Sequence, residues 1–80
     1  MNAIKYTLQT FGIQRASVKR FIRSVGGEVE DGDSVKVIFT TNRKSVVQSV
    51  NNAFGTRLST EAEGLHSDWA RADVWNKYNS

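Results

Sequence analysis

Residues 28–40 read Glu28-Val29-Glu30-Asp31-Gly32-Asp33-Ser34-Val35-Lys36-Val37-Ile38-Phe39-Thr40. Apolar and polar side chains alternate in both halves of this stretch, which is the pattern of strands that bury one face. An Asp-Gly step between two alternating runs is a strong signal for a hairpin. The stretch therefore predicts two antiparallel strands, over residues 28–30 and 34–40, joined by an acidic turn.

The chain before this hairpin predicts one strand and one helix. The strand, over residues 3–11, is indicated by apolar residues that alternate with polar ones: Ile4, Tyr6 and Leu8. The helix, over residues 15–25, is indicated by apolar residues at i, i+3, i+4 and i+7: Val18, Phe21, Ile22 and Val25. Gly26 and Gly27 end it, because glycine readily takes the left-handed conformation that closes a helix.

The chain after the hairpin predicts a second helix over residues 42–54, which begins at a capping Thr or Asn and ends at Gly55. Residues 56–61 contain one apolar anchor, Leu58, and predict a weak strand. Residues 67–78 begin with a capping residue and contain neither Gly nor Pro, so they predict a terminal helix.

The order of these elements is that of the split βαβ arrangement, the ferredoxin-like plait. We therefore predict an α+β fold with this plait in residues 1–62 and an aromatic, helical extension in residues 63–80. Crossovers in such sheets are right-handed, so both helices are expected on one face of the sheet and parallel to each other. The first and third strands are expected to be adjacent and parallel.

The composition fits one small domain in a reducing compartment. The chain has 80 residues and no cysteine, which excludes disulfides, thiolate metal sites and thiol nucleophiles. Heavy-metal-associated domains share this order of elements but bind metal through paired cysteines, so they are excluded too. The sequence shows neither a signal peptide nor an apolar run of membrane-spanning length. We expect a cytoplasmic protein that does not contact a membrane.

Charge is distributed unevenly along the chain. Residues 1–27 and 34–57 contain basic residues and no acid, whereas residues 28–33 are acidic. The candidate binding residues are the cations of the two predicted helices: Arg15, Lys19, Arg20, Arg23, Arg43 and Lys44. With parallel helices, Arg15 is expected near Arg43 and Lys44, where two helix N-termini would attract phosphate or carboxylate. The alternative is an ordinary charged surface.

The predicted sheet has a second face that the two helices do not cover. Alternation places these residues of the first and third strands on it: Lys5, Thr7, Gln9, Phe11, Lys36, Ile38 and Thr40. RNA-recognition domains stack bases on aromatic side chains of such a face. Their aromatic pattern is absent from residues 34–40, and only Phe11 could stack, so that family is not indicated.

The C-terminal residues Trp69, Trp75 and Tyr78 form a second candidate contact site. Such an aromatic segment needs burial, because a large exposed apolar surface favours aggregation. It is expected either to fold over the open sheet face and complete the core, or to dock on another chain, since Trp and Tyr are enriched in binding hot spots.

Catalysis has little support in the sequence. His66 is the only histidine, and Ser67 and Asp68 are too near in sequence to complete a triad with it. The acidic turn lacks the spacing of a calcium loop, and no phosphate-binding glycine motif occurs. We expect neither a metal nor a cofactor.

The sequence therefore favours a small non-enzymatic protein that acts through protein–protein contacts with an acidic partner. An accessory protein or inhibitor that attaches to host machinery, from a bacteriophage or bacterium, would suit such a chain. The alternative is a module that binds DNA or RNA through the basic face of the first helix and the N-termini of both helices.

Overall fold

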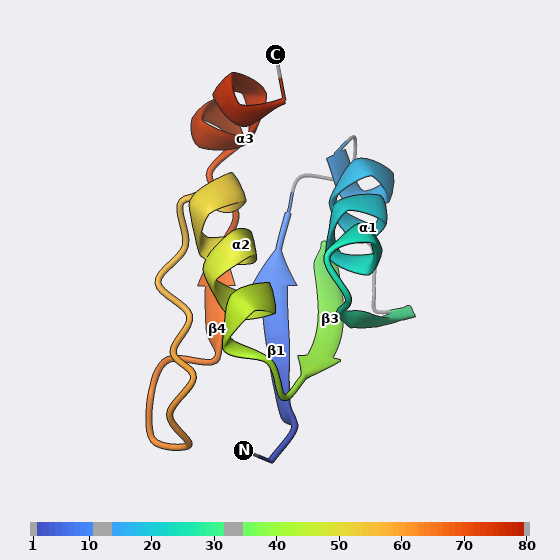
Figure 1. Ribbon diagram of the computed structural model, residues 1–80. Helices are drawn as coiled ribbons and strands as arrows, with labels where there is room; N and C mark the ends of the chain where they lie inside the picture. The colour runs from blue at the N-terminus through green and yellow to red at the C-terminus, as the bar shows by residue number, and fades with distance from the viewer. Residues whose placement is uncertain (1, 11–13, 32–34, 80) are drawn as a thin grey trace.

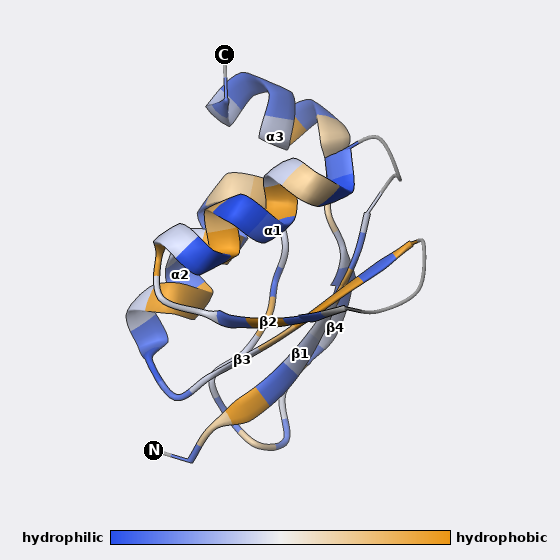
Figure 2. Ribbon diagram, turned by 90° about the vertical axis from the view of Figure 1, so that its right-hand side faces the viewer, coloured by the Kyte–Doolittle hydropathy of each residue, from blue (hydrophilic) through white to orange (hydrophobic). Residues whose placement is uncertain are grey.

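The computed structural model describes residues 2–10, 14–31 and 35–79 and shows an α+β protein (Figure 1). The described chain forms four strands and three helices in this order: β1 Ile4–Gln9, α1 Arg15–Ser24, β2 Glu28–Asp31, β3 Lys36–Thr41, α2 Lys44–Phe54, β4 Ser67–Trp69 and α3 Ala72–Tyr78. All three helices lie on the same side of a single sheet (Figure 2). The prediction that α1 and α2 share one face is confirmed.

The sheet has the order β2-β3-β1-β4 and is mixed. β3 is antiparallel to both of its neighbours, β1 and β2, whereas β4 is parallel to β1. The predicted antiparallel pairing of the two strands in residues 28–40 is confirmed, with Glu28 opposite Thr40 and Val29 opposite Phe39. The turn predicted around Gly32 lies outside the described residues.

The expected parallel pairing of β1 with β3 is wrong. The β1-α1-β2 crossover makes β2 parallel to β1, and the hairpin then makes β3 antiparallel to β2. Because β3 lies between β1 and β2, it is also antiparallel to β1. The helices that follow β1 and β3 therefore begin at opposite ends of the sheet and run antiparallel, as Figure 1 shows.

The segment after α2 also differs from the prediction. Residues 56–61 form no strand, and residues 67–78 form a strand and a shorter helix. The backbone N–H of Thr7 donates to the carbonyl of His66, and that of Ala70 donates to the carbonyl of Gln9, so the strand is held on β1. These bonds stabilise β4 against the helical alternative.

The side chain of Asn51 holds the segment after α2 in place by hydrogen bonds to Thr56 and Leu58. Its Oδ1 accepts hydrogen bonds from Leu58 N and Thr56 Oγ1 at 2.9 and 2.7 Å, and its Nδ2 donates to Leu58 O at 2.8 Å. Leu58 is buried as a result. One amide side chain thus supplies partners that a neighbouring strand would otherwise provide.

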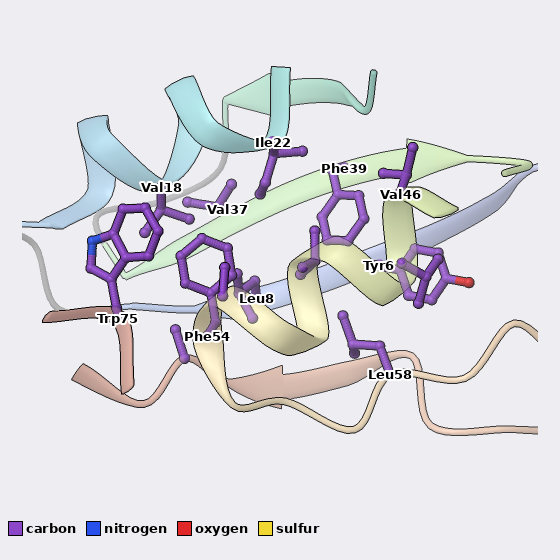
Figure 3. Packing of buried hydrophobic residues seen from close by; sticks show 14 residues of the cluster. Tyr6, Leu8, Val18, Ile22, Val37, Phe39, Val46, Phe54, Leu58 and Trp75 are labelled. Carbon is purple, nitrogen blue, oxygen red and sulfur yellow. The ribbon is translucent and has the colours of Figure 1, made fainter. Parts of the chain in front are cut away.

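The core lies between the sheet and the helices (Figure 3). Inward-facing residues of β1 and β3 pack against both helices, and the fully buried ones include Tyr6, Leu8, Val18, Ile22, Val37, Phe39, Val46, Val50 and Phe54. Trp75 of α3 joins this cluster and is only 5% exposed. β4 and Trp75 both belong to the stretch predicted as an extension, residues 63–80, and take part in the sheet and the core.

Tyr6 connects the core to the segment before β4. Its ring stacks on Phe39 with centroids 5.0 Å apart, and its hydroxyl donates to Ser59 O at 2.8 Å. Burial raises the pKa of Tyr6 above the ordinary value of 10.0. The folded state therefore keeps the phenol proton at pH values where the unfolded chain has lost it.

We predict that Tyr6→Phe lowers the free energy of unfolding by about 1 kcal/mol at neutral pH, because it removes the hydrogen bond to Ser59. The stabilisation by the neutral phenol is complete below the unfolded pKa and is lost as the pH rises through the folded pKa. Urea unfolding at neutral pH and at about pH 11 checks both effects. The variant should lose less stability at alkaline pH than the natural chain; an equally steep loss would contradict the assignment to Tyr6.

Candidate binding surface

The layer formed by α1 and α2 contains basic and neutral residues but no acidic ones. The eight acidic residues all lie outside these two helices: Glu28, Glu30, Asp31, Asp33, Glu61, Glu63, Asp68 and Asp73. Neither helix has a carboxylate in its first turn to offset the partial positive charge of its N-terminus. All charged side chains of these two helices are therefore positive, although the net charge of the chain is only +3.

The structure divides the six predicted cations into two groups. Arg20, Arg23, Arg43 and Lys44 are exposed, and within the described part of the chain they form no ion pair. Arg15 and Lys19 are half-buried and interact within the chain. We call Arg20, Arg23, Arg43 and Lys44 the basic surface.

Arg15 does not lie near Arg43 and Lys44, contrary to the expectation. Arg15 lies at the end of α1 that adjoins the start of β3, where its Nε donates to Lys36 O at 3.5 Å. Because the helices are antiparallel, Gly26 and Gly27, which follow α1, lie beside the start of α2 instead. A Cβ atom on Gly26, which follows α1, would lie 3.1 Å from Nη1 of Arg43. The basic surface therefore continues from the C-terminal half of α1 onto the start of α2.

The N-terminus of α2 does not form a site for a phosphate group. A small hollow of about 170 Å³ opens beside it, lined by Ala3, Gly26, Glu28, Thr40, Thr41, Asn42 and Arg43. The carboxylate of Glu28 would repel a bound anion there. The backbone N–H of Arg43 already donates to Thr41 Oγ1 at 3.1 Å, so this donor is not available to an anion. Arg43 and Lys44 are thus surface cations rather than parts of an anion pocket.

A shallow groove of about 490 Å³ runs between α1 and α3. Its lining combines aromatic rings, small polar groups and one cation: Ser17, Arg20, Phe21, Ser24, Trp75 and Asn79. Phe21 meets Trp75 edge to face at a centroid distance of 5.5 Å. We call this the aromatic groove. Arg20 belongs to both the groove and the basic surface, so the two are continuous.

The three aromatic residues of the C-terminal segment have different environments. Trp75 is buried, whereas Trp69 and Tyr78 are 54% and 55% exposed. α3 packs at the end of the helix layer, where Gln14 Nε2 donates to Asn76 Oδ1 at 3.1 Å. Trp75 of this segment completes the core, which was one part of the first alternative. The other part, that the segment folds over the open sheet face, is wrong, because α3 lies on the side of the sheet that the other helices cover (Figure 2).

The open face of the sheet remains uncovered by the helices (Figure 2). The register confirms the residues predicted on it, apart from Phe11, which lies outside the described residues: Lys5, Thr7, Gln9, Lys36, Ile38 and Thr40. Trp69 was not predicted there. It lies opposite Gln9, which lies opposite Lys36 on its other side, so the three side chains form a row across three strands. A strand of three residues is too short for its alternation to be recognised in the sequence.

The residues considered for catalysis have structural partners. His66 Nε2 lies 2.7 Å from Glu61 O. The carboxylate of Asp68 accepts hydrogen bonds from the backbone N–H groups of Arg57 and Trp69 at 3.0 and 2.8 Å. Asp68 thus braces the segment before β4. Within the described residues, no group of three or more potential ligands could hold a metal ion, and no helix has the length and hydropathy needed to cross a membrane.

The chain matches no protein-family model, and no curated protein and no solved structure is significantly similar to it. Its function is therefore argued from its own surface.

We predict that Trp75→Ala lowers the free energy of unfolding by about 3–5 kcal/mol, because it leaves a cavity among buried aromatic rings. Trp69→Ala should cost no more than about 1 kcal/mol, since the side chain is half exposed. Urea unfolding followed by circular dichroism measures both losses. Equal losses would contradict the placement of the two rings.

Proposed function

We propose that this protein is a non-enzymatic binding module that attaches to an acidic surface of a protein partner. One observation carries the proposal: four exposed cations lie on α1 and at the start of α2, two helices without acids, and one of these cations, Arg20, also lines an aromatic groove. Oppositely charged surfaces accelerate association and exclude partners of the wrong charge. The basic surface and the aromatic groove together form the proposed contact area.

The combination of charge with aromatic rings favours a protein partner. Protein interfaces are enriched in Arg, Trp and Tyr, and their strongest contacts are aromatic or Arg side chains in desolvated pockets. Arg20 lies at the rim of the aromatic groove, and the exposed ring of Tyr78 stacks on Trp75 beside it. A surface used only for phosphate contacts needs cations and hydrogen-bond donors but no such apolar hollow.

A nucleic acid remains the second candidate, because α1 has four cations and no acid along ten residues. A phosphate backbone could follow such a helix. The arrangement differs from the one expected from the sequence, since the N-termini of the two helices do not lie together. The nucleic-acid candidate therefore depends on α1 and on the adjoining Arg43 and Lys44.

We infer that the fold is a variant of the ferredoxin-like plait. Support comes from the β1-α1-β2 unit with β3 inserted between its strands, and from the strand order. A second unit of the same kind would make β4 parallel to β3, whereas β4 is parallel to β1. The proposed setting is the cytoplasm, where an accessory protein or inhibitor of phage or bacterial origin would attach to host machinery.

We predict that the double variant Arg23→Glu/Arg43→Glu loses protein partners that the natural chain retains. The immobilised proteins are exposed to a nuclease-treated bacterial lysate, and retained proteins are quantified by mass spectrometry. The matched control is Lys5→Glu/Arg71→Glu, which changes the net charge equally but lies off the basic surface. The control should retain the partners. If the Arg23/Arg43 variant retains them as well, the basic surface is not the contact area.

We also predict only weak binding of labelled single-stranded DNA, duplex DNA and RNA at about 0.15 M salt, where exposed charges are screened beyond roughly 8 Å. Fluorescence anisotropy over a salt series measures it. Tight binding that falls steeply with salt and disappears in the Arg23→Glu/Arg43→Glu variant would instead establish the nucleic-acid function, since counterion release produces that dependence.

A further inference from the structure

We propose that the aromatic groove binds a short acidic segment of the partner, which inserts one apolar side chain between α1 and α3 and places a carboxylate against Arg20. This inference rests on the proposed function and goes further, because it specifies the chemistry of the segment that the partner presents.

The apolar part of the groove is already formed in the free protein. The ring of Phe21 is surrounded by Phe54, Trp75 and Tyr78, with centroid distances of 5.4, 5.5 and 5.6 Å. Trp75 is 5% exposed and therefore fixed by its neighbours. Filling a preformed apolar hollow requires little reorganisation of the protein. Most of the free energy gained by burying an inserted Leu or Phe side chain would therefore appear as binding affinity.

The polar part of the groove favours a carboxylate beside that side chain. Among the described residues, Arg20 is the one charged group in the lining, and no carboxylate is present there. The hydroxyl of Ser24 already donates its hydrogen to Phe21 O at 2.6 Å, so Arg20 is the donor left for a carboxylate of the ligand. The guanidinium of Arg20 can bind a carboxylate through two hydrogen bonds. Asp73 of α3 is paired with Arg71 at 3.3 Å and does not line the groove.

The length of the groove limits the length of the segment. Ser17 and Ser24 are seven residues apart on α1, which corresponds to about 10 Å at the rise of an α-helix. An extended chain covers that distance with about three residues. The ligand is therefore a segment with Asp or Glu within about three positions of an apolar residue, and Arg23 can bind a further acid beyond the groove.

Two other occupants fit less well. A nucleic-acid base would need an exposed ring face on which to stack, and of the two rings in the lining Phe21 is half-buried and Trp75 is almost completely buried. The exposed ring of Tyr78 lies outside the lining. A second copy of the chain could present its own exposed acidic loop, residues 61–65, which includes the exposed Leu65. That loop already has internal hydrogen bonds, such as Gly64 N to Glu61 O at 3.0 Å, so it does not offer an extended segment.

The test uses random short peptides displayed on phage and selected on the immobilised full chain. Selected peptides should contain Asp or Glu within about three positions of Leu, Ile, Phe or Trp. Labelled copies of the selected peptides are then measured by fluorescence anisotropy. Their affinity should fall at least about tenfold for Ser17→Leu, which fills the groove without changing charge, and for Arg20→Glu.

The matched control is Gln48→Leu, which adds an apolar side chain on the exposed side of α2, away from the groove lining. It should leave the affinity unchanged, and circular dichroism confirms that all variants are folded. No enrichment, enrichment without this pattern, or undiminished binding to Ser17→Leu would each overturn the proposal. So would concentration-dependent self-association of the natural chain that Ser17→Leu abolishes, because a second copy would then occupy the groove.

The two proposals can fail separately. In the lysate experiment, partners that are retained by Ser17→Leu but lost from Arg23→Glu/Arg43→Glu would overturn the groove proposal and leave the proposed function standing. Partners retained by both variants would overturn both proposals.

Discussion

β3 occupies the position between β1 and β2, and the rest of the structure depends on that insertion. Since β3 is hydrogen-bonded to both strands, α1 must cross over it to connect them, and α2, which follows β3, must begin at the opposite end of the sheet. Gly26, which follows α1, therefore lies beside Arg43 and Val46 at the start of α2. This approach brings the C-terminal end of α1, where Arg23 is located, toward Arg43, twenty residues later in the sequence.

The same arrangement separates the charges of the molecule. The helices α1 and α2 have only basic and neutral residues, while the acidic residues of the described chain lie on the edge strand β2, in the segment before β4, in β4 and in α3. Charged residues on a short edge strand discourage pairing with another chain. The acids of β2 thus protect the sheet at its edge, and one of them, Glu28, also lies beside Arg43 in the hollow at the start of α2. The net charge is modest, but basic and acidic residues lie on different elements, and the positions of the charges determine which partners the protein can attract.

Periodicity and turn signals were sufficient for β1, α1, the hairpin and α2, because each element has enough residues to show its pattern. β4 could not be predicted, because three residues show no clear pattern and this strand is stabilised by distant parts of the chain. It pairs with β1, and the carboxylate of its own Asp68 accepts a hydrogen bond from the backbone N–H of Arg57. The relative direction of β1 and β3 was predicted incorrectly, and the error moved Arg15 to the wrong neighbours. The half-burial of Arg15 and Lys19 was predictable, because both flank the apolar stripe of α1 when residues are placed at 100° intervals.

Charge and apolar fit have different roles in a surface of this kind. Long-range attraction by the basic surface would raise the association rate, but it recognises any acidic partner, and salt weakens it. Discrimination requires a contact that most acidic surfaces cannot make. In the proposed interaction the aromatic groove would meet that requirement, since it would add short-range burial beside Arg20 and so slow the dissociation of a complementary partner. Because α3 supplies Trp75 to the groove, this helix stabilises the core and shapes the aromatic groove with the same side chain.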